Sequence, residues 1–120
     1  MIKDFLMVGI GGAIGSMLRY GTNLAIGSKI FPLSTLLINI IGSFAIGLFF
    51  GISMKNEAIA ANWKLFFITG ICGGFTTFSA FSLENMQLLI NGKYGLFALY
   101  IIASILLGLA AVIAGYRLIH

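Results

Sequence analysis

Four long apolar stretches follow one another along the sequence, separated by short polar segments. Residues 30–54, 65–83 and 94–116 contain no Asp, Glu, Lys or Arg, and residues 5–26 contain only Arg19. A helix needs about 20 apolar residues to cross the ~30 Å hydrocarbon core of a bilayer. The pattern therefore predicts an all-α integral membrane protein, one domain over residues 1–120, with four transmembrane helices near 4–26, 33–53, 63–89 and 96–118.

The composition supports a membrane protein and argues against several other classes. The chain is 60% hydrophobic and 8% charged, whereas soluble domains are about 25% charged. Its basic residues are scattered singly, so we expect no nucleic-acid partner. One His, one Cys and no paired carboxylates leave no catalytic or metal-ligand spacing, so we expect no enzyme.

The basic residues are almost evenly divided between the two sides of the membrane. With four crossings, the side of the termini has Lys3, Lys55, Lys64 and Arg117, and the other side has Arg19, Lys29 and Lys93. Because positive charge sets orientation, this balance allows two interpretations. Either one or two residues still decide the orientation, or the chain inserts both ways and forms an antiparallel, dual-topology dimer.

Small residues recur at four-residue spacing in three of the predicted helices. Such spacing lets helix backbones approach closely in lipid, where packing drives association. Tight helix packing is sufficient to account for it. The series are Gly11 and Gly15, then Ser43, Gly47 and Gly51, then Ser104 and Gly108.

The third predicted helix contains a segment that disfavours continuous helix. Residues 73–77 read Gly-Gly-Phe-Thr-Thr, and glycine and threonine propagate helices poorly. If Trp63 lies at the membrane interface, Gly73 lies about 15 Å deeper at 1.5 Å per residue, near the midplane. We therefore predict a break near residues 73–79; a simple packing kink is the alternative.

A break at that depth could form an ion-binding site in an antiparallel dimer, because the two-fold axis of such a dimer also lies at the midplane. Two copies of the break would meet there, and their carbonyl oxygens would suit a hard cation such as Na⁺. The N-terminus of the restarted helix would present amide donors and a positive dipole end to an anion.

Several side chains near the break have a functional and a structural interpretation. Phe78 and Phe81 share a helix face, and their positive ring edges could line an anion path or simply pack in the core. Asn39 could donate to an anion or to a neighbouring helix. Tyr100 and Ser104 place two hydroxyls on one face of the fourth helix.

Two charged residues complete the set. Glu84 is the only acidic residue inside a span, where carboxyl groups are usually functional or paired, although it could also lie near the opposite interface. Arg19 would extend to a membrane face, either as an interfacial anchor or as a vestibule charge that attracts anions.

These residues resemble the Fluc (CrcB) fluoride channels of bacteria and other microbes along the whole chain. The resemblance is carried by residues 11–15 (Gly-Gly-Ala-Ile-Gly) with Arg19-Tyr20, by Pro32 with residues 35–44, and above all by residues 70–84. It implies an antiparallel homodimer in the bacterial cytoplasmic membrane, with two pores that export fluoride passively and confer resistance.

The resemblance also implies roles for individual residues. A central structural Na⁺ would be held by the main-chain carbonyls of Gly73 and Thr76, and Arg19 would line a vestibule. The fluoride pore would be lined by Asn39, Thr77, Phe78, Ser79, Phe81, Tyr100 and Ser104.

Two positions depart from the family: Ala80 stands where Thr is usual, and Gly108 where some relatives have a polar residue. Some relatives are heterodimers; the even charge count favours a homodimer.

Two other functions fit four short membrane helices. A small multidrug transporter exchanges drugs for protons and requires a membrane-embedded carboxylate in its first helix, but that helix has none after Asp4, which lies at its edge. A membrane assembly subunit that transports nothing is the other alternative, but such a function does not explain the predicted break and its polar neighbours.

Overall fold

The computed structural model describes residues 1–26, 31–55 and 61–120, and these ranges are helical with no strand. The predicted loop residues 27–30, including Lys29, and 56–60 lie outside the described residues. The elements are α1 (Ile2–Ile26), α2 (Leu33–Lys55), α3 (Ala61–Lys64), the π-helical η1 (Leu65–Cys72), α4 (Gly73–Phe75), α5 (Phe78–Ile90) and α6 (Tyr94–Ile119).

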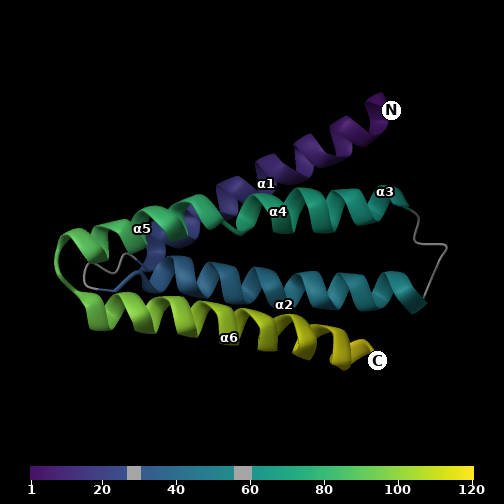
Figure 1. Ribbon diagram of the computed structural model, residues 1–120. Coiled ribbons are helices and arrows are strands. Elements are labelled where there is room, and N and C mark those ends of the chain that lie inside the picture. The colour runs from purple at the N-terminus through teal and green to yellow at the C-terminus, as the bar shows by residue number, and fades with distance from the viewer. Residues whose placement is uncertain (27–30, 56–60) are drawn as a thin grey trace.

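The helices run up and down along one long axis, and both termini lie at the same end (Figure 1). That axis measures 51 Å, enough for a bilayer of about 40–45 Å with its headgroups. Three segments, Leu33–Lys55, Ala61–Ile90 and Tyr94–Ile119, are long and apolar enough to cross a membrane. The prediction of a multi-pass, all-α membrane protein is therefore confirmed at this level.

Helix α1 has 25 residues but is less apolar than α2 and α6. It packs against η1 through glycines that admit no side chain. A methyl group on Gly11 would meet the carbonyl oxygen of Phe66 at 2.5 Å, and one on Gly15 would collide with the carbonyl of Ile71. The predicted close packing through this glycine pair is confirmed.

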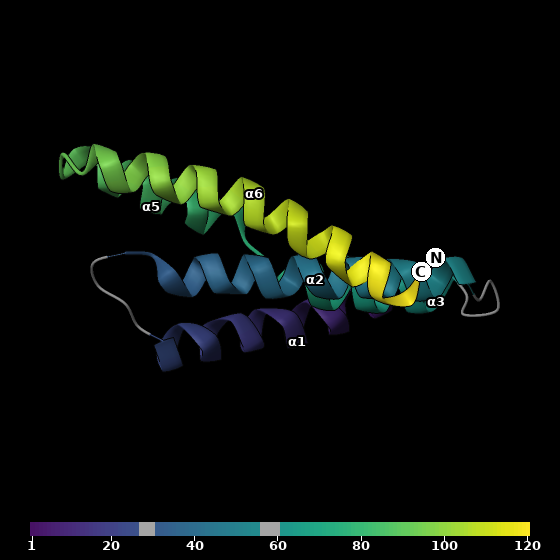
Figure 2. The same ribbon diagram turned by 90° about the horizontal axis from the view of Figure 1, so that it is seen from below.

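Helices α2 and α6 pack together in the same way. Gly47 lies against the carbonyl of Val112, and Gly115 lies against the carbonyl of Phe44. These contacts fall in the C-terminal half of α6, which is where α6 approaches α2 in the view from below (Figure 2). In the N-terminal half of α6, Tyr100 packs with both Leu36 of α2 and Leu88.

The third span is interrupted at two residues. Thr76 (φ −78°, ψ 155°) and Thr77 (φ −148°, ψ 124°) are extended, and α5 starts again at Phe78. The interruption lies inside the range 73–79 but not at the two glycines. Gly73 and Gly74 stay helical because Gly74 packs on α1, where a methyl group would meet the carbonyl oxygen of Gly12 at 2.5 Å.

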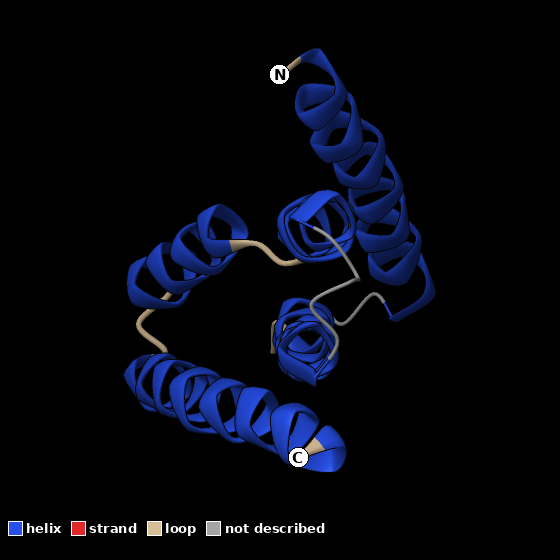
Figure 3. Cartoon of the chain, turned by 90° about the vertical axis from the view of Figure 1, so that its right-hand side faces the viewer, coloured by secondary structure: helices blue, strands red, loops and turns tan. Residues whose placement is uncertain are grey.

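The interruption displaces α5 from the axis of the first half of the span. Viewed along the bundle, α5 stands apart from α1 and from α3–α4, to which it is joined by the short loop (Figure 3). Leu88 of α5 forms a buried core with Leu36 of α2 and Tyr100 of α6, and Phe81 of α5 packs against it. This displacement places the interruption opposite α2 and α6.

Candidate functional site

A cleft of about 310 Å³ opens beside the interruption, between α2, α5 and α6. It brings together six of the predicted site residues, together with four other residues. Its lining consists of Asn39, Ser43, Ile46, Thr76, Thr77, Phe78, Phe81, Ser104, Ile105 and Gly108. The cleft therefore combines amide and hydroxyl groups with two aromatic rings.

Asn39 holds the extended backbone of the interruption. Its Nδ2 donates to the carbonyl oxygen of Thr77 at 3.2 Å, and its Oδ1 accepts from the amide of Thr77 at 2.9 Å. The side-chain amide thus replaces the helical acceptor that the Thr77 amide has lost, and it adds a donor to the Thr77 carbonyl, which as the N-cap of α5 also accepts the first bond of that helix. Because Nδ2 carries two hydrogens, one donor remains beyond this pair of bonds, on a residue that lines the cleft.

The hydroxyl of Thr77 caps the restarted helix. Its Oγ1 accepts from the amide of Ala80 at 3.1 Å and lies 3.3 Å from Oγ of Ser79. This is the usual role of threonine at an N-cap. The positive dipole end of the 13-residue α5 is consequently at the cleft. Ser79 is exposed and does not line the cleft.

Two carbonyls of the interruption lose their helical donors. In a continuous α-helix, Gly73 O would accept from the amide of Thr77, and Thr76 O from that of Ala80. Here the Thr77 amide donates to Asn39 and the Ala80 amide to Thr77 Oγ1. Gly73 and Thr76 therefore offer main-chain oxygens of the kind that hard cations bind.

The two phenylalanines differ in their surroundings. Phe78 is 78% exposed, whereas Phe81 is half-buried and packs on the ring of Tyr100 at a centroid distance of 4.9 Å. The two rings lie 5.7 Å apart and are inclined by 41°. Both line the cleft, so their ring edges are available beside its polar groups.

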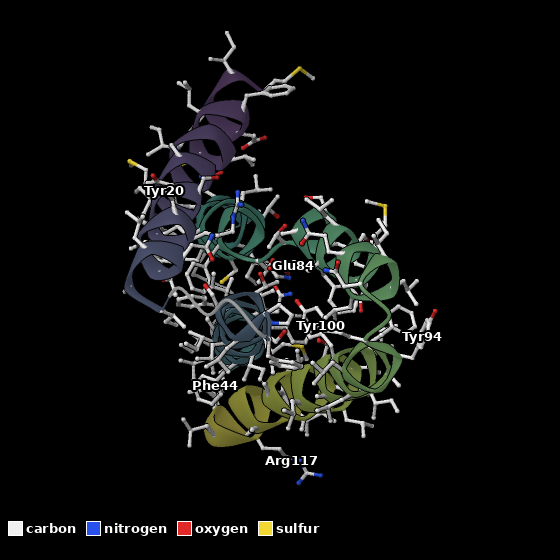
Figure 4. The ribbon with its side chains drawn as sticks, turned by 90° about the vertical axis from the view of Figure 1, so that its left-hand side faces the viewer. Tyr20, Phe44, Glu84, Tyr94, Tyr100 and Arg117 are labelled. Carbon is white, nitrogen blue, oxygen red and sulfur yellow. The ribbon has the colours of Figure 1, made fainter. Side chains whose placement is uncertain are left out.

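Glu84 joins three helices through its carboxyl group. It accepts from Thr35 Oγ1 of α2 and from Tyr100 Oη of α6, both at 3.0 Å. Figure 4 shows the labelled Glu84 and Tyr100 converging in the interior, while Arg117 points outward. Tyr100 is fully buried and lies behind Phe81 rather than in the cleft lining. The sequence signalled Glu84 as an acidic residue within a span, but nothing identified Thr35 as its partner.

We expect the variant Glu84→Gln to be less stable by about 1–3 kcal/mol, the cost of leaving one buried polar group unpaired. The side-chain oxygen of glutamine can replace one carboxylate oxygen as an acceptor for Thr35 or Tyr100. Its NH₂ group donates only and cannot accept the other hydrogen bond. The measurement is the thermal unfolding of the purified protein in detergent, compared with Gln87→Glu on the exposed side of α5. Equal stability of Glu84→Gln and the parent would show that the carboxyl does not join the helices.

The hydroxyl group of Ser104 is buried and lacks a hydrogen-bond partner among the described residues. Gly108 lies one turn further along α6, where an added methyl group would lie 3.8 Å from Oγ of Ser43. Ser43, which the sequence associated only with helix packing, instead lines the cleft.

Arg19 contacts the main chain at the end of α4. Its Nε donates to the carbonyl oxygen of Gly74 at 3.1 Å, and it is not part of the cleft lining. The expectations that this side chain extends to a membrane face and lines a vestibule stay predictions. The guanidinium turns inward because the end of α4 has a carbonyl to satisfy and a negative dipole end to neutralise.

Comparison with known proteins places these features in a family. The CrcB-like protein family (Camphor Resistance, CrcB) matches residues 6–116. The fluoride-specific ion channel FluC of Azobacteroides pseudotrichonymphae is 51% identical over 121 residues, covering 98% of this chain and 97% of the relative. The protein of the same name from Flavobacterium psychrophilum is 46% identical over 117 residues, covering 95% and 94%. The chain therefore belongs to the CrcB-like family.

Proposed function

We propose that this protein is a fluoride channel that spans the membrane four times, with α1 as the fourth crossing, and exports fluoride passively. The observation that carries the proposal is the cleft at the interruption, which gathers an amide, hydroxyls and two phenylalanine rings in a chain 51% identical to a fluoride-specific ion channel. We place it in the bacterial cytoplasmic membrane, where export would confer fluoride resistance.

The chemistry of the cleft suits a small, strongly hydrated anion. Such an ion gives up water only where donors replace it, yet conduction requires sites weak enough to release it. The remaining Nδ2 hydrogen of Asn39, the hydroxyl of Ser104 and the ring edges of Phe78 and Phe81 supply such donors without a fixed positive charge. Thr77, Ser79 and Tyr100 act beside them by holding the helix start and the ring of Phe81. Arg19 serves as a vestibule charge, whose positive guanidinium attracts anions toward the interruption.

Two copies in antiparallel orientation would complete the channel. Phe78, at the start of α5, is 78% exposed in the single chain although it lines the cleft, and α5 stands away from α3–α4 in Figure 3. A second copy related by an axis in the membrane plane would cover each cleft and form two pores. The nearly even division of basic residues between the two sides supports insertion in both orientations.

A structural Na⁺ would fit the carbonyl oxygens of Gly73 and Thr76, which have lost their helical donors. Two such oxygens from each copy would give a set of hard ligands on the dimer axis. The ion would neutralise the carbonyl dipoles where two α4 C-terminal ends meet.

We therefore expect replacement of Na⁺ by a bulky organic cation to weaken the dimer and reduce fluoride flux together. The measurement is the dimer fraction at increasing dilution in detergent, with and without Na⁺, at constant ionic strength. Dimer and flux that are both indifferent to Na⁺ would remove the cation from the proposal.

Efflux from liposomes, followed with a fluoride electrode, tests the channel itself. We expect fluoride to leave protein-loaded liposomes rapidly when a potassium ionophore balances the charge, while chloride is retained. Proton-coupled drug exchange would instead indicate a small multidrug transporter, and the absence of any flux would indicate an assembly subunit. Either of these results would contradict the proposed function.

A further inference from the structure

A second crevice, of about 170 Å³, lies at the other end of α2 and shares no lining residue with the fluoride cleft. It is formed where the last turns of α2 face the start of the third span. Its lining consists of Phe49, Ile52, Ser53, Trp63, Lys64, Phe67 and Ile68. Nothing in the proposed conduction of fluoride uses these residues.

The interior of this crevice is aromatic and aliphatic. The rings of Phe49 and Phe67 pack on each other in its wall, with centroids 4.8 Å apart, and the indole of Trp63 stacks on Phe67 at 5.8 Å with an interplanar angle of 25°. Such walls favour a hydrocarbon chain rather than an ion or a polar solute. They are fixed by their mutual contacts, so the slot is already formed in the single chain.

The rim of the crevice is positive. Lys64 lines the crevice, and its Nζ lies 5.4 Å from the centroid of the Phe50 ring of α2, a residue of the neighbouring groove. Lys55 is the last residue of α2, and Trp63 is 50% exposed. Tryptophan and lysine at the start of a span mark the headgroup level of a bilayer. The crevice therefore has its apolar part in the membrane and its charge at the surface.

A larger groove between α2 and α6 provides a contrast. It has a volume of about 380 Å³ and is lined by residues without charge: Ile46, Gly47, Phe50, Val112, Ile113 and Tyr116. Any lipid chain can lie in that groove, but no group in its lining distinguishes one headgroup from another. Lys64 is itself a lining residue of the crevice, whereas it meets this groove only at the ring of Phe50.

We propose that this crevice is a binding site for one anionic phospholipid of the surrounding bilayer. An acyl chain lies in the crevice against the packed rings of Phe49 and Phe67, and the phosphate lies against the ammonium group of Lys64. The negative headgroup complements Lys64, whereas a zwitterionic headgroup brings its own positive charge to the same place. The site adds lipid selectivity to the protein independently of fluoride conduction.

Trp63 provides the measurement, because it is the only tryptophan among the 120 residues. Its fluorescence is recorded in liposomes that contain increasing fractions of phosphatidylglycerol or phosphatidylcholine brominated on one acyl chain. We expect the anionic lipid to quench with about fivefold higher apparent affinity, the factor that corresponds to one lysine near an anionic surface.

Matched variants separate this site from general surface charge. Lys64→Gln should abolish the preference, whereas Lys93→Gln, before α6 at the opposite end of the helices, should keep it. Ser53→Phe should fill the slot and lower quenching by both lipids. The proposal fails if the parent protein is quenched equally by both lipids, or if Lys55→Gln reduces the preference as much as Lys64→Gln. Since quenching needs no flux, either outcome leaves the test of the fluoride channel unaffected.

Discussion

Replacement of Asn39 by leucine is expected to abolish fluoride flux and to destabilise the protein more than any other single change in the cleft. Leucine has a similar size but can neither donate to Thr77 O nor accept from Thr77 N. The Thr77 amide would be left unpaired in the membrane interior, at about 1–3 kcal/mol, and the Thr77 carbonyl would lose one of its two donors. The measurements are the apparent melting temperature in detergent and fluoride efflux from liposomes.

Asn91→Leu is the matched control for this variant, because Asn91 is an exposed asparagine at the end of α5. It should leave both flux and melting temperature close to those of the parent. If Asn39→Leu also behaves like the parent, the interruption must be held by other contacts. If it loses flux at unchanged stability, Asn39 serves the ion alone and not the backbone.

Phe81→Ile is expected to stop fluoride flux while the protein still folds and associates. Isoleucine keeps an apolar side chain against Tyr100 but has no ring edge to present to an anion. The lost aromatic pair costs about 0.5–1.5 kcal/mol, which a helical bundle packed through its glycine contacts should tolerate. The measurements are liposome efflux and the dimer fraction found by chemical cross-linking.

Phe5→Ile serves as the control for this substitution, because Phe5 lies on α1 and is 73% exposed. We expect it to conduct like the parent protein. Full flux from Phe81→Ile would remove Phe81 from the conduction path. Loss of both flux and association would instead assign Phe81 to packing, and the ring of Phe78 would become the next one to test.

The sequence was most informative about the third span. Its Gly-Gly-Phe-Thr-Thr segment predicted an interruption, and the structure has one, but at Thr76 and Thr77 rather than at the glycines. The difference arises because intrinsic helix propensity says nothing about neighbours. Gly74 is helical because α1 needs its missing side chain for close approach, a requirement that becomes visible only when both helices are placed.

Pairings between distant residues could not be predicted from patterns along the chain. Asn39 and Thr77 are 38 positions apart and Thr35 and Glu84 are 49 apart, so their hydrogen bonds depend on how α2 lies beside α5. The same holds for Arg19, whose charge suggested the membrane surface although its partner is the carbonyl of Gly74. Residue type identified these side chains as unusual, and only their partners decide what they do.

The link between Glu84 and Tyr100 also bears on biosynthesis, because the acidic residue leaves the ribosome before its tyrosine partner. Until α6 enters the membrane, the carboxyl group in α5 has only the hydroxyl of Thr35 beside it. A carboxyl so exposed to lipid disfavours stable insertion. The third and fourth spans are therefore expected to enter the bilayer as a pair, and in a nascent chain that ends before Tyr94 the third span should remain accessible to added protease although the first two spans anchor the chain.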